Sequence, residues 1–133
     1  MPVRSLRSSV FKWPNEQDVD RAMRQWAAEI GQHDTNIRRV GYTGSYAHGN
    51  WGVGSDLDVL IVVDESHQPC MQRALAWDTS ALPVPADVMV YTQAEWAAMA
   101  RQNSRFYREA ARQAVWVYER PQDASADSPK KIP

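Results

Sequence analysis

The sequence has little cysteine and little net charge. Cys70 is the single cysteine, which excludes an intramolecular disulfide and a cysteine-based zinc site and gives no sign of an oxidising compartment. Fifteen Lys and Arg residues nearly cancel sixteen Asp and Glu residues, for a formal net charge of -1. Because no broad cationic surface is available, non-specific binding to a nucleic-acid backbone is disfavoured.

Long apolar runs are also missing. The longest, Val59 to Val63, is far too short to span a membrane, and residues 1–14 contain no apolar core of signal-peptide length. We therefore expect a cytoplasmic protein without a membrane span. The 133 residues are expected to form one domain over residues 1–120, followed by a polar, disordered tail over residues 121–133.

The apolar periodicity predicts alternating helices and strands. Asn15 is a plausible N-cap for a helix that continues to Gly31, and Thr92 with Glu95 forms a capping-box pattern for a second long helix that breaks at Asn103. The resulting order predicts an α+β fold, a mixed β-sheet flanked by helices. Strands are expected at 37–43, 57–63, 86–91 and 115–118, and further helical segments at 46–49, 70–77 and from 105 onwards.

Apolar residues in two of these helical segments are expected to face inward. In the first segment they are Met71, Ala74, Leu75 and Trp77, and in the second Phe106, Ala110, Ala111 and Ala114. The tryptophans are scattered rather than interleaved with Lys and Arg, so we expect core or partner-interface roles rather than a base-stacking platform. They are Trp13, Trp26, Trp51, Trp77, Trp96 and Trp116.

Two carboxylates stand at the start of the apolar strand over residues 57–63. Asp56 and Asp58 are two positions apart, and alternate residues of a strand share one face. At ~4 Å and an effective dielectric near ~20 such charges repel by about 4 kcal/mol, so we expect a cation between them. Asp87 reaches the same site if its strand is a neighbour, and such an oxygen cluster suits Mg²⁺. For the pair alone, simple solvation at an exposed strand end is the alternative.

A glycine-rich turn precedes these carboxylates. Gly44-Ser45 follows the strand over residues 37–43, and free N–H groups at a helix start together with a serine hydroxyl can hold an anion. Alone, this pattern is more often a plain turn. Joined to the carboxylate pair, it indicates a site for metal-bound polyphosphate, although the chain has neither a P-loop nor an EF-hand motif.

The joined motif resembles that of a known family. GSYAHG (residues 44–49) followed by GSDLDV (residues 54–59) is similar to the signature of the DNA polymerase β-like nucleotidyltransferases, in particular the minimal nucleotidyltransferase (MNT) group with its MntA-type antitoxins. Asp87 matches the third carboxylate of the family, and the closing VWVYE resembles the last strand of these domains. The resemblance covers about residues 37–119.

The resemblance implies Mg²⁺-dependent transfer of a nucleoside monophosphate from ATP, or another NTP, to a hydroxyl group, with release of pyrophosphate. It implies that Asp56, Asp58 and Asp87 are catalytic and bind the metal, and that Asp87 also helps to deprotonate the acceptor. The nucleotide would contact Gly44, Ser45, His48, Gly49 and Ser55.

The resemblance also implies a partner. The usual partner of the MNT group is an all-helical HEPN protein, a ribonuclease-like toxin, which is neutralised when AMP is transferred to one of its tyrosines. A chain of this size is expected to lack a second domain for the acceptor, so we expect a type VII-like antitoxin that modifies a HEPN toxin. Two alternatives stay open: a non-catalytic antitoxin that masks its partner, and a small-molecule (antibiotic) nucleotidyltransferase acting as a homodimer.

Position 48 departs from the family pattern. The motif commonly has Arg where this chain has His48, and a mostly neutral imidazole holds phosphate less strongly than a guanidinium. We therefore expect reduced or pH-dependent activity, or help from another arginine such as Arg73 or Arg105. The other histidines, His33 and His67, are expected in surface turns.

Four arginines follow a roughly helical spacing near the C-terminal end of the ordered region. A solvated helix face is the simpler interpretation, and a role in holding phosphate or an acidic partner is the alternative. The four are Arg101, Arg105, Arg108 and Arg112.

Overall fold

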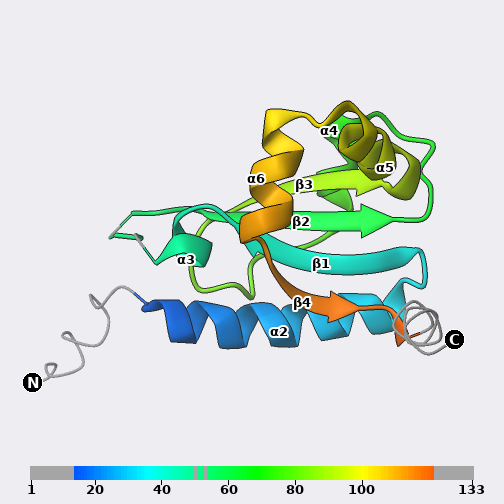
Figure 1. Cartoon of the computed structure of the whole chain (residues 1–133). Helices are drawn as coiled ribbons and strands as arrows, with labels where there is room; N and C mark the ends of the chain where they lie inside the picture. Colours follow the sequence, from blue (N-terminus) through cyan, green and yellow to red (C-terminus); the bar gives the residue numbers. More distant parts are fainter. Residues whose placement is uncertain (1–13, 50, 53, 122–133) are drawn as a thin grey trace, which may run out of the picture.

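The structure is a computed structural model that describes residues 14–49, 51–52 and 54–121. Its four strands form one mixed sheet in the order β3-β2-β1-β4 (Figure 1). β2 and β3 are parallel, whereas β1 is antiparallel to both β2 and β4. The predicted α+β fold with a mixed, helix-flanked sheet is therefore confirmed. The strands are β1 (Ile37–Thr43), β2 (Leu57–Val63), β3 (Ala86–Thr92) and β4 (Val115–Glu119).

Helix α2 (Glu16–His33) covers one face of the sheet (Figure 1). It begins in a capping box, because Asn15 accepts a hydrogen bond from the backbone N–H of Asp18 at 2.9 Å and the Asp18 carboxylate accepts one from the N–H of Asn15 at 3.3 Å. The helix runs past the predicted end at Gly31. This glycine lies against the ring of Tyr118, and its missing side chain makes room for that ring.

Helices α5 (Gln93–Gln102) and α6 (Arg105–Gln113) lie on the opposite face of the sheet (Figure 1). The predicted capping box at Thr92 and Glu95 is present, and Asn103 separates the two helices in a left-handed conformation with φ 55°. Leu60 of β2 packs with Trp96 of α5 on this face, whereas its strand neighbours pack towards α2. Strand β2 is thus buried on both faces, as its continuous apolar run predicted.

The segment between β2 and β3 differs from the prediction. In place of one helix over residues 70–77, a single α-helical turn, α4 (Cys70–Arg73), tightens into a 3₁₀ turn, η1 (Ala74–Ala76). Leu75 was expected to face inward, but it is 84% exposed, because the tighter turn redirects the side chains and Arg73 takes the buried position instead. The side chain of Met71 lies outside the described part of the structure.

In α6 the inward face is also slightly rotated from the expected one. Ala110 is buried and Tyr107 packs beside it, because Tyr107 contacts Trp96. Phe106 and Ala111 were expected to face inward but are exposed. Trp26, Trp51, Trp77, Trp96 and Trp116 all pack into the two apolar clusters, in agreement with the expected core roles, and Trp13 lies outside the described residues.

The predicted extent of the domain and the predicted C-terminal tail are not tested by the structure. Residues 1–13 and most of the expected tail, 122–133, lie outside the described residues. None of the helices in the described parts combines the length and apolar character of a membrane span.

Candidate active site

The parallel pairing of β2 and β3 places two of the predicted carboxylates side by side. Asp58 and Asp87 are register partners in this pair, and the N–H of Leu57 donates to the carbonyl of Pro85 at 2.8 Å just before them. The condition for Asp87 to reach the site of Asp58, namely that its strand is a neighbour, is therefore met. Asp56, two residues before Asp58, lies at the same end of the sheet.

Both carboxylates project towards the sheet face that carries α5 and α6. Side chains alternate along a strand, so Asp58 shares a face with Leu60, and Asp87 shares one with Met89. Leu60 and Met89 both pack in the apolar cluster that contains Trp96 of α5. The two carboxylates thus lie on the same face of the sheet as this apolar cluster, just beyond its end.

The glycine turn packs directly on Asp58. Gly44 has a positive φ of 85° and leads into the single-turn helix α3 (Ser45–His48). A Cβ atom at Gly44 would collide with Oδ2 of Asp58 and would lie 3.2 Å from its Cγ. Glycine is needed here both for the backbone conformation and for this close approach. The turn and the acidic strand, which the sequence predicted to form one site, are in contact.

Strand β1 leads into this turn and is fixed to α2 just before it. The hydroxyl of Tyr42 donates to Asp20 of α2 at 2.8 Å, and Asp20 also accepts from Arg24 at 2.7 Å. Burial is the main cause that raises the pKa of Tyr42, so its hydroxyl stays protonated and keeps donating. Sequence reasoning missed this contact, because residues 22 positions apart gave no signal.

The site carries an excess of negative charge. Burial raises the pKa of the Asp58 carboxyl, and the neighbouring charges of Asp87 and then Asp56 raise it further. None of these three carboxylates forms a hydrogen bond or an ion pair with another described residue. By contrast, hydrogen bonding from Arg120 lowers the pKa of Asp64.

Oxygen donors of this kind suit Mg²⁺, and the mutual repulsion would be relieved by a cation. As the side chains stand, however, no three His, Cys, Asp or Glu residues in the described part of the chain are spaced to hold a metal ion. Asp56 and Asp87 are exposed, so both can change rotamer without disturbing the core. Binding of one ion by all three carboxylates therefore requires side-chain rotation and remains a prediction.

The other predicted site residues lie in or beside the turn. Ser45 begins α3, exposed His48 ends it, and Gly49 caps it with a left-handed φ of 82°. The hydroxyl of Ser55 accepts a hydrogen bond from the N–H of Gly52 at 2.8 Å and so closes the loop before β2. Contacts between these residues and a nucleotide remain predictions.

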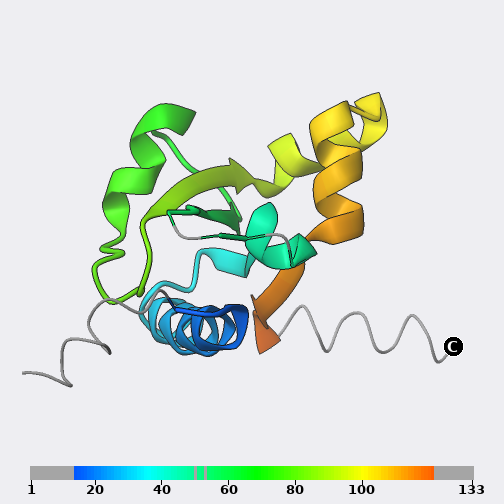
Figure 2. The ribbon, with the colours of Figure 1, turned by 90° about the vertical axis from the view of Figure 1, so that its left-hand side faces the viewer.

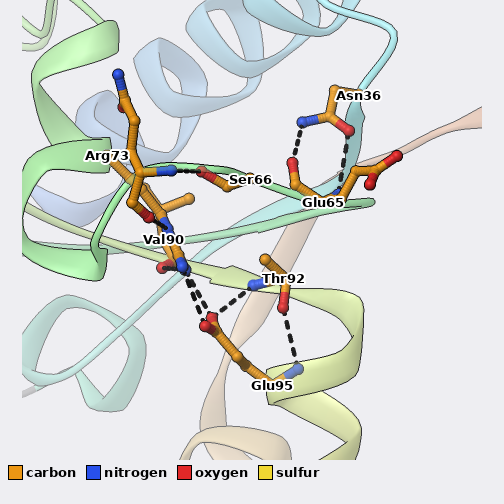
Figure 3. A network of polar contacts seen from close by, with 8 residues as sticks. Asn36, Glu65, Ser66, Arg73, Val90, Thr92 and Glu95 are labelled. Atoms are coloured by element: carbon orange, nitrogen blue, oxygen red, sulfur yellow. Dashed lines mark hydrogen bonds and ion pairs between the residues drawn. The ribbon is translucent and has the colours of Figure 1, made fainter.

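The two arginines considered as substitutes for an arginine at position 48 are engaged elsewhere. Arg73 is 7% exposed and donates to both carboxylate oxygens of Glu95, at 2.6 and 3.0 Å, and to the carbonyl of Val90 at 3.2 Å (Figure 3). It therefore ties α4 to β3 and α5. Arg105 is largely exposed and lies 3.5 Å from Glu109. Among the described residues, neither arginine bonds to the three carboxylates.

The fold and the site define an α+β domain with an acidic, oxygen-rich site at one end of a mixed sheet, next to a glycine turn. The sequence places this domain in a family. The nucleotidyltransferase domain model matches residues 23–111, and the chain belongs to that family. The site residues in Gly44–Asp58 and Asp87 all lie within the matched region.

Solved structures with the same fold include an inferred nucleotidyltransferase of Sulfolobus solfataricus, with a TM-score of 0.57 at 17% identity over 79% of this chain and 84% of that one. A toxin–antitoxin solved with AMP-PNP matches at a TM-score of 0.49 and 19% identity, over 90% and 85% of the chains. A toxin–antitoxin MntA-HpeT mutant matches at a TM-score of 0.46 and 16% identity, over 90% of this chain and 84% of that one. No curated protein sequence matches this chain significantly.

Proposed function

We propose that this protein is a Mg²⁺-dependent nucleotidyltransferase that moves AMP from ATP to a hydroxyl group of a partner protein, namely a tyrosine of a HEPN toxin, and so acts as a type VII-like antitoxin. The observation that carries the proposal is the register of Asp58 with Asp87 beside the Gly44 turn. Membership of the nucleotidyltransferase domain family supports the reaction type.

The residues divide into three roles. Asp56, Asp58 and Asp87 would hold Mg²⁺, which supplies positive charge to the phosphate oxygens. The Gly44-Ser45 turn would hold the triphosphate, with His48, Gly49 and Ser55 next to it. Asp87 would accept the proton of the acceptor hydroxyl. The oxygen of that hydroxyl would form a bond to the α-phosphorus of ATP, while the bond between the α-phosphorus and the pyrophosphate oxygen breaks.

The exposure of the site supports a macromolecular acceptor. Asp56 and Asp87 are exposed, and Asp58 is half-buried at the end of the sheet. A side chain on the surface of another protein can approach such a site directly, whereas a small acceptor gains most of its binding energy from an enclosing pocket. A tyrosine hydroxyl on a folded partner meets this requirement.

A non-catalytic antitoxin that masks its partner is the second candidate. It is favoured by His48 in place of the usual arginine. Without such a cation the phosphate would be held less strongly.

Labelled ATP separates the two candidates. The protein is incubated with Mg²⁺, ATP labelled in the α-phosphate and the protein encoded by the adjacent gene. We expect label on that partner, loss of the label with Asp56→Asn, and no label in EDTA. Tight binding of the partner without label would contradict the transferase and support the masking function.

A further inference from the structure

Helix α6 presents a row of arginines to solvent. Arg105, Arg108 and Arg112 are spaced three and four residues apart, which places them on one side of the helix, opposite buried Ala110. Arg101 at the end of α5 is exposed as well. These four residues are named the arginine face.

Little negative charge offsets this face. Within the described part of the chain, the arginine face forms one ion pair, between Arg105 and Glu109 at 3.5 Å. Arg101, Arg108 and Arg112 have neither an ion pair nor a side-chain hydrogen bond with any described residue. The positive charge is therefore concentrated and available on a protein whose formal net charge is -1.

The C-terminal end of α6 leads to the end of the sheet that carries the candidate active site, because Val115, two residues after α6, pairs with Tyr42 just before the Gly44 turn. Asp58 and Asp87 project on the sheet face that α6 covers, and Figure 2 shows α6 standing beside α3, the helix that follows the Gly44 turn. A partner that rests on α6 therefore comes close to the carboxylates without having to cross the sheet.

We propose that the arginine face docks an acidic surface of the protein acceptor and so brings the acceptor hydroxyl to the carboxylates. This inference rests on the proposed function, because it names the docking surface of that same site. Guanidinium groups attract carboxylates, and charges at the rim of an interface speed association and fix orientation.

An acidic protein fits this surface better than a nucleic acid does. Single-stranded nucleic acids are bound on several aromatic rings on which successive bases can stack. Tyr107 of α6 packs on Trp96, and Phe106, 37% exposed and with its ring centroid 6.0 Å from that of Tyr91, is a single ring rather than a stacking platform. The neighbouring carboxylates would also repel a long phosphate backbone, whereas a protein can present its acidic groups to α6 alone.

Charge reversal tests the docking surface. Binding of the adjacent gene's protein to the full chain is measured by calorimetry at low and at physiological salt, for wild type, Arg108→Glu and the matched control Arg21→Glu, which reverses an exposed arginine on α2. We expect Arg108→Glu to raise Kd by about tenfold and to reduce the salt dependence, and Arg21→Glu to change Kd less than about twofold. Arg108→Lys is expected to recover most of the affinity.

Three results would overturn the inference: equal Kd values for Arg108→Glu and Arg21→Glu, no binding by wild type, or displacement of the partner protein by an RNA hairpin that itself binds in an Arg108-dependent way. Label transfer from ATP is measured in parallel. If Arg108→Glu binds the partner as tightly as wild type and label is still transferred, the docking surface is contradicted and the transferase function is supported. If binding depends on Arg108 but no label is transferred, the transferase function is contradicted and the docking surface is supported.

Discussion

Gly44 shows how much a single missing side chain can determine at this site. A Cβ at this position would collide with the Asp58 carboxylate, so any larger residue would displace that carboxylate. Gly54 offers a natural comparison, because it has a similar positive φ of 90° but no atom within 4 Å of an added Cβ. The two glycines therefore separate backbone strain from the close approach to Asp58.

Alanine at each glycine tests this distinction. Gly44→Ala and Gly54→Ala each place a Cβ at a positive φ, and this backbone strain should cost roughly 1–3 kcal/mol of stability. Gly44→Ala alone should also lose most of the rise in melting temperature that Mg²⁺ with ATP gives the wild type, because Asp58 is displaced. Thermal unfolding with and without Mg²⁺ and ATP is the measurement, and an equal nucleotide response of the two variants would refute the role of the contact.

The raised pKa of Asp58 gives a pH-dependent stability with a defined sign. Because burial and the charges of Asp87 and Asp56 raise the folded pKa above the ordinary 3.8, the native state binds more protons than the unfolded state just above that value. Stability from this group is present below pH 3.8 and is lost as pH rises through the folded pKa.

Asp58→Asn should therefore melt higher than the wild type at neutral pH in EDTA, by a few degrees, and the difference should shrink as the pH falls to 3.8. Melting temperatures across this pH range measure the effect. Mg²⁺ with ATP should stabilise the wild type and leave Asp58→Asn almost unchanged. A lower melting temperature for Asp58→Asn at neutral pH would contradict the electrostatic strain at this site.

At the scale of elements, signals within one segment were readable and contacts between segments were not. Asn15 and Thr92 marked helix starts correctly, because a cap involves residues three positions apart. Leu75 and Ala111 were placed on the wrong side, because the side that faces inward depends on partners far along the chain. Arg73 fills the place expected for Leu75, and its partner Glu95 is 22 residues away.

The Arg73–Glu95 contact is expected to hold α4 against β3 and α5. Arg73→Met should cost about 2 kcal/mol, because it leaves the carbonyl of Val90 and the carboxylate of Glu95 without their donor. Glu95 is partly exposed, so the full cost of an unpaired buried charge does not apply. Urea denaturation measures the change.

The exposed Arg105–Glu109 pair supplies the control for this measurement. Arg105→Met should change stability by less than about 0.5 kcal/mol, because exposed pairs contribute little. Similar losses for Arg105→Met and Arg73→Met would show that the buried position of Arg73 adds nothing.

At the scale of the whole molecule, the sequence was sufficient to predict the mixed sheet and the contact of the glycine turn with the acidic strand. The apolar runs defined the strands, and the joined motif linked Gly44 to Asp56 and Asp58. Whether Asp87 would lie beside Asp58 depended on a parallel pairing that spacing alone cannot show. The position of α6 over the same face depends on packing between distant segments, so the setting of its arginines became visible in the structure alone.

The strand order also constrains how the protein can be made. β4, the last strand, completes the sheet by pairing with β1, the first, so that Tyr42 meets Val115 and Arg39 meets Glu119. As the chain leaves the ribosome, one edge of β1 has no partner strand until β4 has emerged, although the glycine turn and all three carboxylates were synthesised long before. Until β4 pairs with it, this edge of β1 is therefore open to edge-to-edge association with another chain.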